Sequence, residues 1–198
     1  MRFSPFRSLA LVLALAAGAA QAQVPATVRV DYTHSGNALS DQYALERVLI
    51  EALPWPGDMT QTIDRSNRGQ NLLEVVDAKT GELLYSRGFS TIFGEWRTTD
   101  EAGRMSRGFH ESVRFPKFDK PVRVRILKRD DRNQFALTWS VEVDADAPEV
   151  VRKQGPAPAL PIAIRRGGPS PQKVDLLILG DGYTRAEMKK FEADARRL

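Results

Sequence analysis

The chain has 198 residues, of which 42% are hydrophobic and 27% charged, a formal net charge of +4, and no cysteine. So small a positive charge argues against nucleic acid as a partner, and the lack of cysteine excludes disulfide bonds and thiolate metal sites. The fold must therefore be stabilised by the burial of apolar side chains.

Residues 1–22 are typical of a secretory signal peptide. Arg2 and Arg7 precede an apolar run over residues 9–20, and Ala-Gln-Ala at residues 20–22 is a small-residue cleavage site. The run is too short for a membrane-spanning helix. We therefore expect an exported protein, periplasmic or extracellular, without a transmembrane segment.

Residues 23–150 show mainly the period-two alternation of β-strands. Apolar and polar side chains alternate in six short runs: residues 28–32, 72–76, 82–86, 109–115, 122–126 and 135–143. Residues 40–53 fit a helix or a strand, and the Pro-Trp-Pro-Gly that follows favours the strand. Short strands separated by turns at residues 77–81 and 130–133 predict an antiparallel β-sandwich, and so a mainly β fold class.

Two details of this pattern can be checked in a structure. The first strand is expected to end in a turn at residues 34–37, which would leave His34 exposed. The run at residues 135–143 has the strictest alternation and places Leu137, Trp139 and Val141 on one face of a strand, towards the core.

The end of the chain has a different character. Residues 151–171 are rich in proline and glycine and predict a stiff, extended linker. In residues 172–198, an apolar run at 174–179 predicts a strand buried on both faces. A Gly-Asp-Gly turn and a capping box of Thr184 and Glu187 then begin an amphipathic helix. One strand and one helix cannot bury each other fully, so we expect the chain to end inside its second domain.

Histidine offers few candidates for chemistry, because the chain has only His34 and His110. His110 and Glu111 begin like the zinc-peptidase motif H-E-x-x-H, but Arg114 stands where the second histidine is needed. The surrounding alternation predicts a strand, in which four residues span about 13 Å, too far for one zinc ion. We interpret His110 and Glu111 as ordinary strand residues on a solvated face, and we assign no catalytic, cofactor-binding or metal-binding residue.

Three other groups of residues have a possible ligand-binding role. Basic side chains recur along the later strands, at Arg114, Arg123, Arg125, Lys128 and Arg129; the solvated side of a sheet explains them better than an anion site. Trp96, Trp139, Phe89 and Phe93 fit core anchors better than a ligand platform. The glycine turn at residues 180–182 lacks the third glycine of a dinucleotide fingerprint and the lysine of a P-loop, and Asp181 would repel phosphate.

Residues 173–184 (KVDLLILGDGYT) resemble the opening of the catalytic domain in the IgA-peptidase family of zinc metallopeptidases, metallopeptidase family 64. Residues 84–90 (LYSRGFS), 93–96 (FGEW) and 111–116 (ESVRFP) resemble the N-terminal β-sandwich of that family. The resemblance covers nearly all of the chain after residue 22. It implies a secreted zinc endopeptidase with a protein or peptide substrate, whose H-E-x-x-H helix lies downstream of this chain.

The sequence therefore predicts the N-terminal portion of a monomeric, secreted zinc peptidase, inactive by itself and without a cofactor of its own. The zinc ion is expected in the full-length parent. A stand-alone exported β-sandwich that binds a ligand is the second hypothesis, and an α/β phosphate binder beginning at Lys173 is the third. An H-E-x-x-H motif encoded beyond codon 198 would support the first, and a stop codon there the second.

Overall fold

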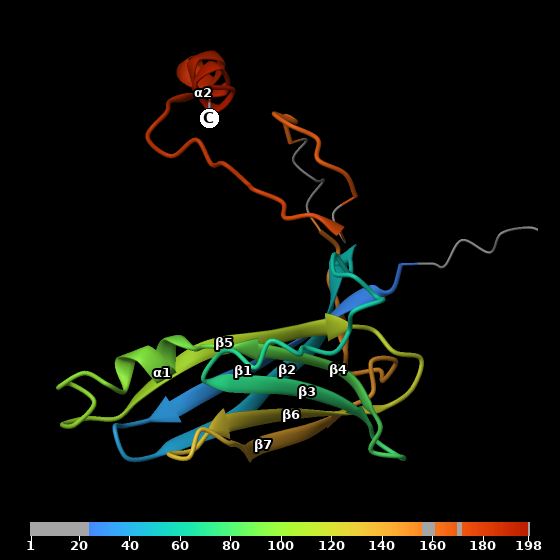
Figure 1. The fold of residues 1–198 in the computed structure, drawn as a ribbon, viewed down its shortest axis with the longest axis vertical. Coiled ribbons are helices and arrows are strands. Elements are labelled where there is room, and N and C mark those ends of the chain that lie inside the picture. The colour runs from blue at the N-terminus through green and yellow to red at the C-terminus, as the bar shows by residue number, and fades with distance from the viewer. Residues whose placement is uncertain (1–23, 156–160, 170–171, 198) are drawn as a thin grey trace, which may run out of the picture.

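The computed structural model describes residues 24–155, 161–169 and 172–197, so the predicted signal peptide at residues 1–22 lies outside it. Two four-stranded sheets are packed face to face (Figure 1). The first sheet has the order β5-β1-β2-β8, and the second has the order β4-β3-β6-β7. Neighbouring strands are antiparallel, except for the short parallel pair of β2 and β8. The predicted mainly β fold, an antiparallel β-sandwich, is confirmed.

The strands lie where the alternating runs predict them. The first sheet contains β1 (Ala26–Gly36), β2 (Asp41–Pro54), β5 (Arg107–Pro116) and β8 (Val151–Arg152). The second contains β3 (Asn71–Asp77), β4 (Leu83–Phe89), β6 (Val122–Arg129) and β7 (Phe135–Val143). The ambiguous residues 40–53 form β2, because there they pair along the length of β1.

The core lies between the two sheets and is built from alternate side chains of both. The first sheet contributes Val28, Val30, Tyr32, Val113 and Phe115, and the second contributes Leu73, Val75, Val124, Ile126 and Val143. Each of these side chains is almost completely removed from water. Burial of this kind stabilises a fold by roughly 25 cal/mol per Å² of apolar surface.

The tight turn between β3 and β4 forms as predicted. The Asp77 carboxylate accepts hydrogen bonds from the backbone N–H groups of Lys79 at 2.8 Å and Thr80 at 2.9 Å. Gly81 has a φ of 75°, a left-handed conformation that a side chain would disfavour. This turn sets the register of the hairpin, as residues 77–81 alone indicate.

The strand β7 departs from its predicted pattern at one position. Its register against β6 shifts between Ile126, opposite Trp139, and Leu127, opposite Leu137. Thr138, which lies between Trp139 and Leu137 at the shift, donates its hydroxyl to the Ile126 carbonyl oxygen at 2.9 Å. Leu137 is consequently 53% exposed, so the prediction that it points into the core with Trp139 is wrong.

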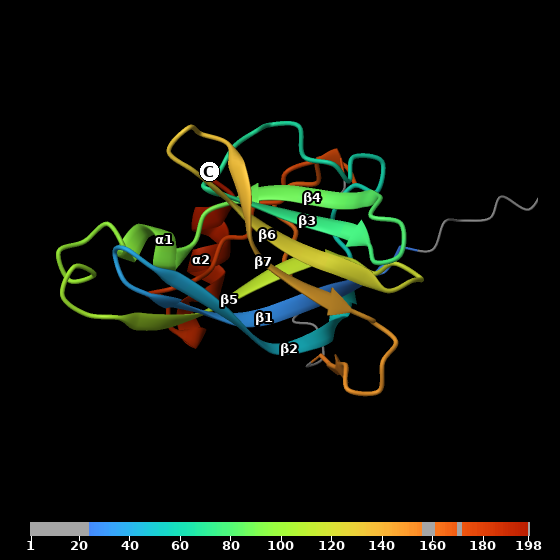
Figure 2. The ribbon, with the colours of Figure 1, turned by 90° about the horizontal axis from the view of Figure 1, so that it is seen from below.

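A short helix, α1 (Ile92–Trp96), covers one end of the sandwich beside β1 and β5 (Figure 2). It begins at Thr91, whose hydroxyl accepts a hydrogen bond from the Gly94 N–H at 2.8 Å. The side chains of Phe93 and Trp96 are buried. They form a small second core with Ala102, so the interpretation of these aromatic residues as anchors is confirmed.

The boundary of the sandwich lies slightly later than residue 150. Val151 and Arg152 form β8 and pair with Leu49 and Ile50 of β2. The backbone N–H of Lys153 then donates to the Ile50 carbonyl oxygen at 3.0 Å. The first residues of the predicted linker therefore belong to the first sheet.

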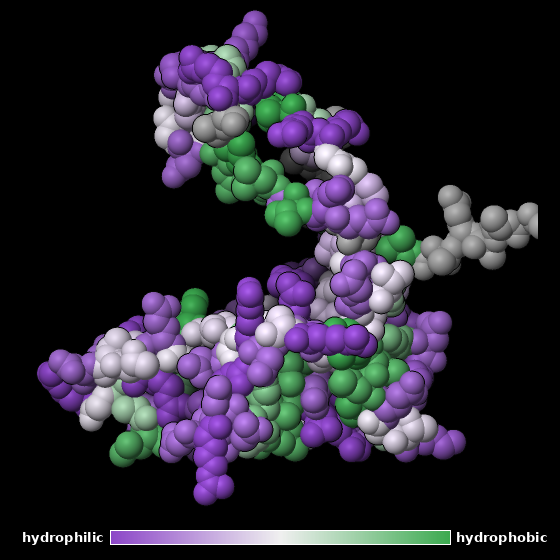
Figure 3. Space-filling model, in the orientation of Figure 1, coloured by the Kyte–Doolittle hydropathy of each residue, from purple (hydrophilic) through white to green (hydrophobic). Residues whose placement is uncertain are grey.

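Residues 174–179 do not form the predicted strand. Val174, Leu176, Leu177 and Leu179 are between 74% and 96% exposed, and Figure 3 shows apolar surface along the segment that leads to α2. A strand buried on both faces needs neighbouring strands, and no described residue pairs with this one. The predicted capping box does form, ahead of a 3-10 turn, η2 (Arg185–Glu187), and α2 (Met188–Ala195).

Among the described residues, no helix is long and apolar enough to cross a membrane.

Deleting residues 172–198 should leave the stability of the sandwich nearly unchanged, because Val174, Leu176, Leu177 and Leu179 are exposed and the helix α2 packs mainly on its own segment. We expect a change of less than about 0.5 kcal/mol in the free energy of unfolding, as for an ordinary surface change. Urea unfolding followed by circular dichroism measures it. The shortened chain should also aggregate less, because an exposed apolar segment is removed. A clear loss of stability would mean that the segment packs against the sandwich.

Candidate functional site

His34 is buried, although the sequence predicts it in an exposed turn. The strand β1 continues to Gly36, so the ring alternates with Val30 and Tyr32 towards the interior and is 2% exposed. It lies between the rings of Tyr43, at 4.1 Å between centroids, and Phe93, at 3.9 Å. The prediction was wrong because it ended the strand too early; the period-two pattern, continued by two residues, places His34 inside.

Carboxylates lie near both nitrogen atoms of this ring. Nδ1 is 3.1 Å from an oxygen of Glu111, and Nε2 is 3.7 Å from an oxygen of Asp41. Glu111 also accepts a hydrogen bond from the Phe93 backbone N–H at 3.2 Å. Glu111 is therefore a buried residue that holds His34 and α1 in place, and its prediction as a solvated strand residue is wrong. The same prediction is right for His110, which is exposed and lies 2.7 Å from Glu46.

Asp41 extends the cluster to the second sheet. Its carboxylate accepts hydrogen bonds from Arg97, just after α1, at 2.9 Å and from Lys128 on β6 at 2.5 Å. Burial would raise the pKa of Asp41, but the hydrogen bond from Lys128 and the charges of Lys128 and Arg97 outweigh it, so the pKa is lowered. We call His34, Asp41, Arg97, Glu111 and Lys128 the buried charge cluster. The side chains of His34 and Glu111 are at most 8% exposed, and those of the other three are between 17% and 28% exposed. The cluster joins both sheets to α1.

The buried charge cluster is built for stability more than for catalysis. Asp41 lies within 2.9 Å of both Arg97 and Lys128, and Glu111 lies 3.1 Å from a ring nitrogen of His34, so each charged side chain has a partner in the cluster. The imidazole is covered on both faces by aromatic rings. A general base must reach the proton that it abstracts from the substrate, and His34 is closed to substrate on every side.

The histidines do not fit a zinc site. His34 pairs with Phe109 and His110 pairs with Thr33, so the two are on adjacent strands but one residue out of step, and they face opposite sides of the first sheet. Zinc needs ligands that converge within about 2.0–2.3 Å of one point. The described residues contain no group of three histidine, aspartate or glutamate side chains that could hold a metal ion.

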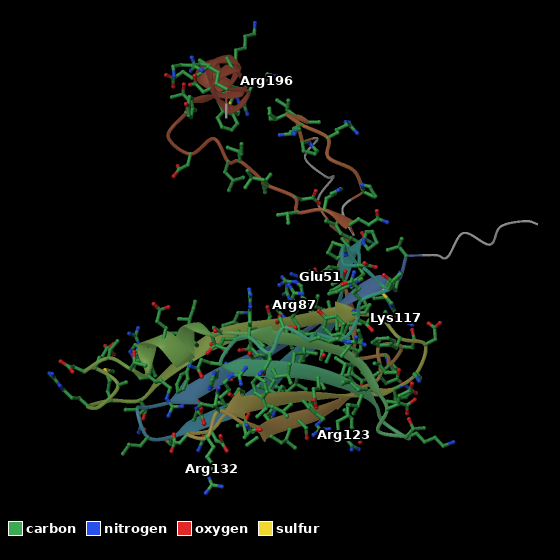
Figure 4. All side chains as sticks on the ribbon, in the orientation of Figure 1. Glu51, Arg87, Lys117, Arg123, Arg132 and Arg196 are labelled. Atoms are coloured by element: carbon green, nitrogen blue, oxygen red, sulfur yellow. The ribbon has the colours of Figure 1, made fainter. Side chains whose placement is uncertain are left out.

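The basic residues singled out in the sequence do not form one surface. Arg114, on the first sheet, bonds to Glu51 at 2.8 Å. Arg123, on the second sheet, bonds to Glu142 at 2.5 Å, and Figure 4 shows Arg123 and Glu51 on different sides of the sandwich. Arg125 lies 3.5 Å from Glu74, Lys128 belongs to the buried charge cluster, and Arg129 donates to backbone carbonyl oxygens. Pairing within a sheet face therefore accounts for Arg114, Arg123 and Arg125, and structural contacts between elements account for Lys128 and Arg129.

The glycine turn before η2 has no free helix start for a phosphate. The Glu187 carboxylate accepts hydrogen bonds from the Thr184 backbone N–H at 3.0 Å and from its hydroxyl at 2.7 Å. These bonds lower the pKa of Glu187, so its negative charge occupies the position that an anionic ligand would take.

Acid should destabilise the sandwich through carboxylates such as Asp31. Burial would raise the pKa of Asp31, but hydrogen bonds from Arg29 and Arg47, both at 2.7 Å, outweigh it and lower the pKa. Because folding lowers the pKa of this carboxyl group, its ionised form stabilises the fold. This stabilisation is complete above the pKa of the unfolded state, about 3.9, and is lost as the pH falls through the pKa of the folded state. Urea midpoints should be similar at pH 7 and pH 5 and clearly lower at pH 3. The variant Asp31→Asn should show a smaller drop, whereas equal midpoints at pH 5 and pH 3 would contradict the expectation.

Two protein families match the chain, one after the other. The family described as Peptidase M64 N-terminus matches residues 20–140, which is more than half of the chain. The family described as IgA Peptidase M64 matches residues 162–198 and so begins inside the range predicted as a linker. No curated protein matches the chain.

Proposed function

This chain belongs to the peptidase M64 family, and on that premise we propose that it is the N-terminal portion of a secreted, zinc-dependent endopeptidase. The observation that carries the proposal is the order of the two matches, an N-terminal domain followed by the IgA peptidase domain. The β-sandwich is then an accessory domain, and residues from about 162 onwards begin the peptidase domain.

Under this proposal, the residues that hold the zinc ion belong to a part of the protein outside residues 1–198. His34 and His110 face opposite sides of the first sheet, and the sequence has no cysteine, so no zinc ligand set can be built from them. When bound, the zinc ion would polarise the scissile carbonyl group and activate a water molecule. The contribution of residues 174–179 is structural. In the full protein this segment would form a strand between strands of the peptidase domain, where its apolar side chains would be buried.

Export and assembly belong to the same proposal. The basic start, the apolar run and the cleavage site in residues 1–22 support secretion into the periplasm or the medium. N-terminal sequencing of the exported protein should then begin at Gln23, and an exported protein that keeps Met1 would refute it. We further propose that the protein is monomeric, which light scattering at several concentrations can check.

The test uses the complete reading frame of which residues 1–198 form the start. The full protein should hydrolyse a labelled protein substrate, lose this activity with 1,10-phenanthroline, and recover it when zinc is added. Residues 1–198 alone should show no hydrolysis and no one-to-one zinc binding in calorimetry. Hydrolysis that resists the chelator, or tight zinc binding by residues 1–198, would overturn the proposal.

A further inference from the structure

A groove runs along the edge of the second sheet, between the segment 60–66 and the strand β4. Its volume is about 620 Å³, and its lining includes Thr62, Asp64, Arg65, Tyr85 and Arg87. A smaller hollow of about 160 Å³ continues from it. The two share Asp64 and Arg65, and the smaller one extends to Arg68, Leu72 and Phe135.

The walls of the groove are held rigidly by backbone contacts. The Ser86 N–H donates to the Thr62 carbonyl oxygen at 2.9 Å, and the Asp64 N–H donates to the Ser86 hydroxyl at 2.9 Å. The Gly88 N–H donates to the Asp64 carboxylate at 2.7 Å. A Cβ atom at Gly88 would lie 2.1 Å from the Arg68 carbonyl oxygen, so the segment lies directly against β4. A groove formed before binding loses little entropy when a ligand is ordered in it.

The far end of the segment is anchored to β6. Arg129 donates to the carbonyl oxygens of Asn67 at 2.7 Å and Gly69 at 2.8 Å. Its guanidinium also lies 4.1 Å from the centre of the Phe135 ring. The apolar end of the groove therefore has a fixed position relative to the charged end.

The groove is positively charged. Arg65, Arg68 and Arg87 are exposed, and none of their guanidinium groups forms a hydrogen bond or ion pair within the part of the chain that the structure describes. The only acid in the lining is Asp64. Hydrogen bonds from the Ser66 side chain and from the backbone N–H groups of Gly88 and Ser66, together with the charge of Arg87, lower its pKa. The groove thus contains Arg65 and Arg87 and the smaller hollow adds Arg68, against one carboxylate that is already hydrogen-bonded.

We propose that this groove binds an extended peptide segment that carries acidic side chains. Arg65 and Arg87 lie one on each wall of the groove. Each planar guanidinium group can donate two parallel hydrogen bonds to one carboxylate group, in bidentate fashion. Leu72 and Phe135 in the smaller hollow would accept an apolar side chain next to the acidic ones. That apolar end distinguishes a peptide from an inorganic anion, which would use the arginines alone.

The source of the peptide follows from the proposed function, on which this step rests: an acidic segment of the protein substrate would bind in the groove. The groove is small, and contacts below about 1,200 Å² are typical of weak encounters. Because the arginines are exposed, the attraction should be screened by salt. We therefore expect reversible binding that is strong only at low ionic strength.

The test measures the fluorescence anisotropy of a fluorescein-labelled peptide, in which glutamates flank one phenylalanine, with residues 23–198 at low and high salt. The double variant Arg65→Gln/Arg87→Gln should weaken binding about tenfold or more, since two charged hydrogen bonds are lost. Arg132→Gln is the matched control, because Arg132 is exposed, lines neither hollow and lies on the other side of the sandwich from Arg87 in Figure 4. It should bind the peptide like the wild type.

A second peptide with glutamine in place of glutamate should not bind, and inorganic phosphate should compete poorly. Absence of saturable binding by the wild type, equal binding by the double variant, or full competition by phosphate would each overturn the proposal. Neither arginine forms a hydrogen bond or ion pair with another described residue, so the circular dichroism spectra of the variants should match that of the wild type. The assay needs no proteolysis, so its failure differs from a failure of the chelator test.

Discussion

Replacing Phe93 with alanine should lower the free energy of unfolding by about 3–5 kcal/mol, the usual cost of truncating a buried aromatic side chain. Phe93 is fully buried and is the only aromatic residue that links α1 to the buried histidine among the described residues. Its ring lies 3.9 Å from His34, 5.7 Å from Trp96 and 6.1 Å from Phe109. Its loss would leave a cavity where the small second core meets the main one.

The neighbouring residue provides the control for this experiment. Ile92 belongs to the same helix but is 65% exposed, so Ile92→Ala should change the stability by less than about 0.5 kcal/mol. Urea unfolding of both variants, with the same slope as the wild type, measures the difference. Equal effects of the two substitutions would show that α1 does not pack on the sandwich in solution.

Replacing Asp41 with alanine should cost about 1–3 kcal/mol, because it leaves two partly buried cations of the cluster, Arg97 and Lys128, without their partner. The carboxylate bonds to Arg97 and Lys128 and lies 3.7 Å from the Nε2 atom of His34. Through these contacts it ties the beginning of β2 to α1 and to β6 of the other sheet. The loss should therefore appear in the stability of the whole sandwich.

Asp119→Ala is the matched control for the loss of a carboxylate. Asp119 is fully exposed and lies 3.4 Å from Lys117, an ion pair worth little in water. Its removal should change the free energy of unfolding by less than about 0.5 kcal/mol. If Asp41→Ala were equally mild, water would be replacing the carboxylate in the cluster, and the cluster would not join the sheets.

Much of the sandwich could be predicted from the sequence because its signals are local. Alternating side chains identify the strands, since successive residues of a strand point to opposite faces. The turn at residues 77–81 and the capping box of Thr184 and Glu187 depend on residues three or four apart, and both form. The same alternation showed that His110 does not begin a zinc-binding motif, because residues four apart on a strand are too far apart to bind one zinc ion.

Other features depended on contacts between residues far apart in the chain. His34 and Glu111 are 77 residues apart, and only the pairing of β1 with β5 and the packing of α1 bury them together. Leu137 is exposed because of a register shift against β6. Alternation says which side chains share a face of a strand, but not where that strand slips or which face another element covers.

The sequence by itself determined the class of fold, the order of the strands along the chain and the family resemblance, since these depend on local patterns and motifs. The tertiary structure alone decided which charges are buried, that most of residues 174–179 remain exposed, and that Arg65 and Arg87, which bond to none of the described residues, line one groove. The physical reason is that burial and pairing are properties of neighbours in space. Arg65 and Arg87 resemble other surface arginines until the segment 60–66 is fixed against β4.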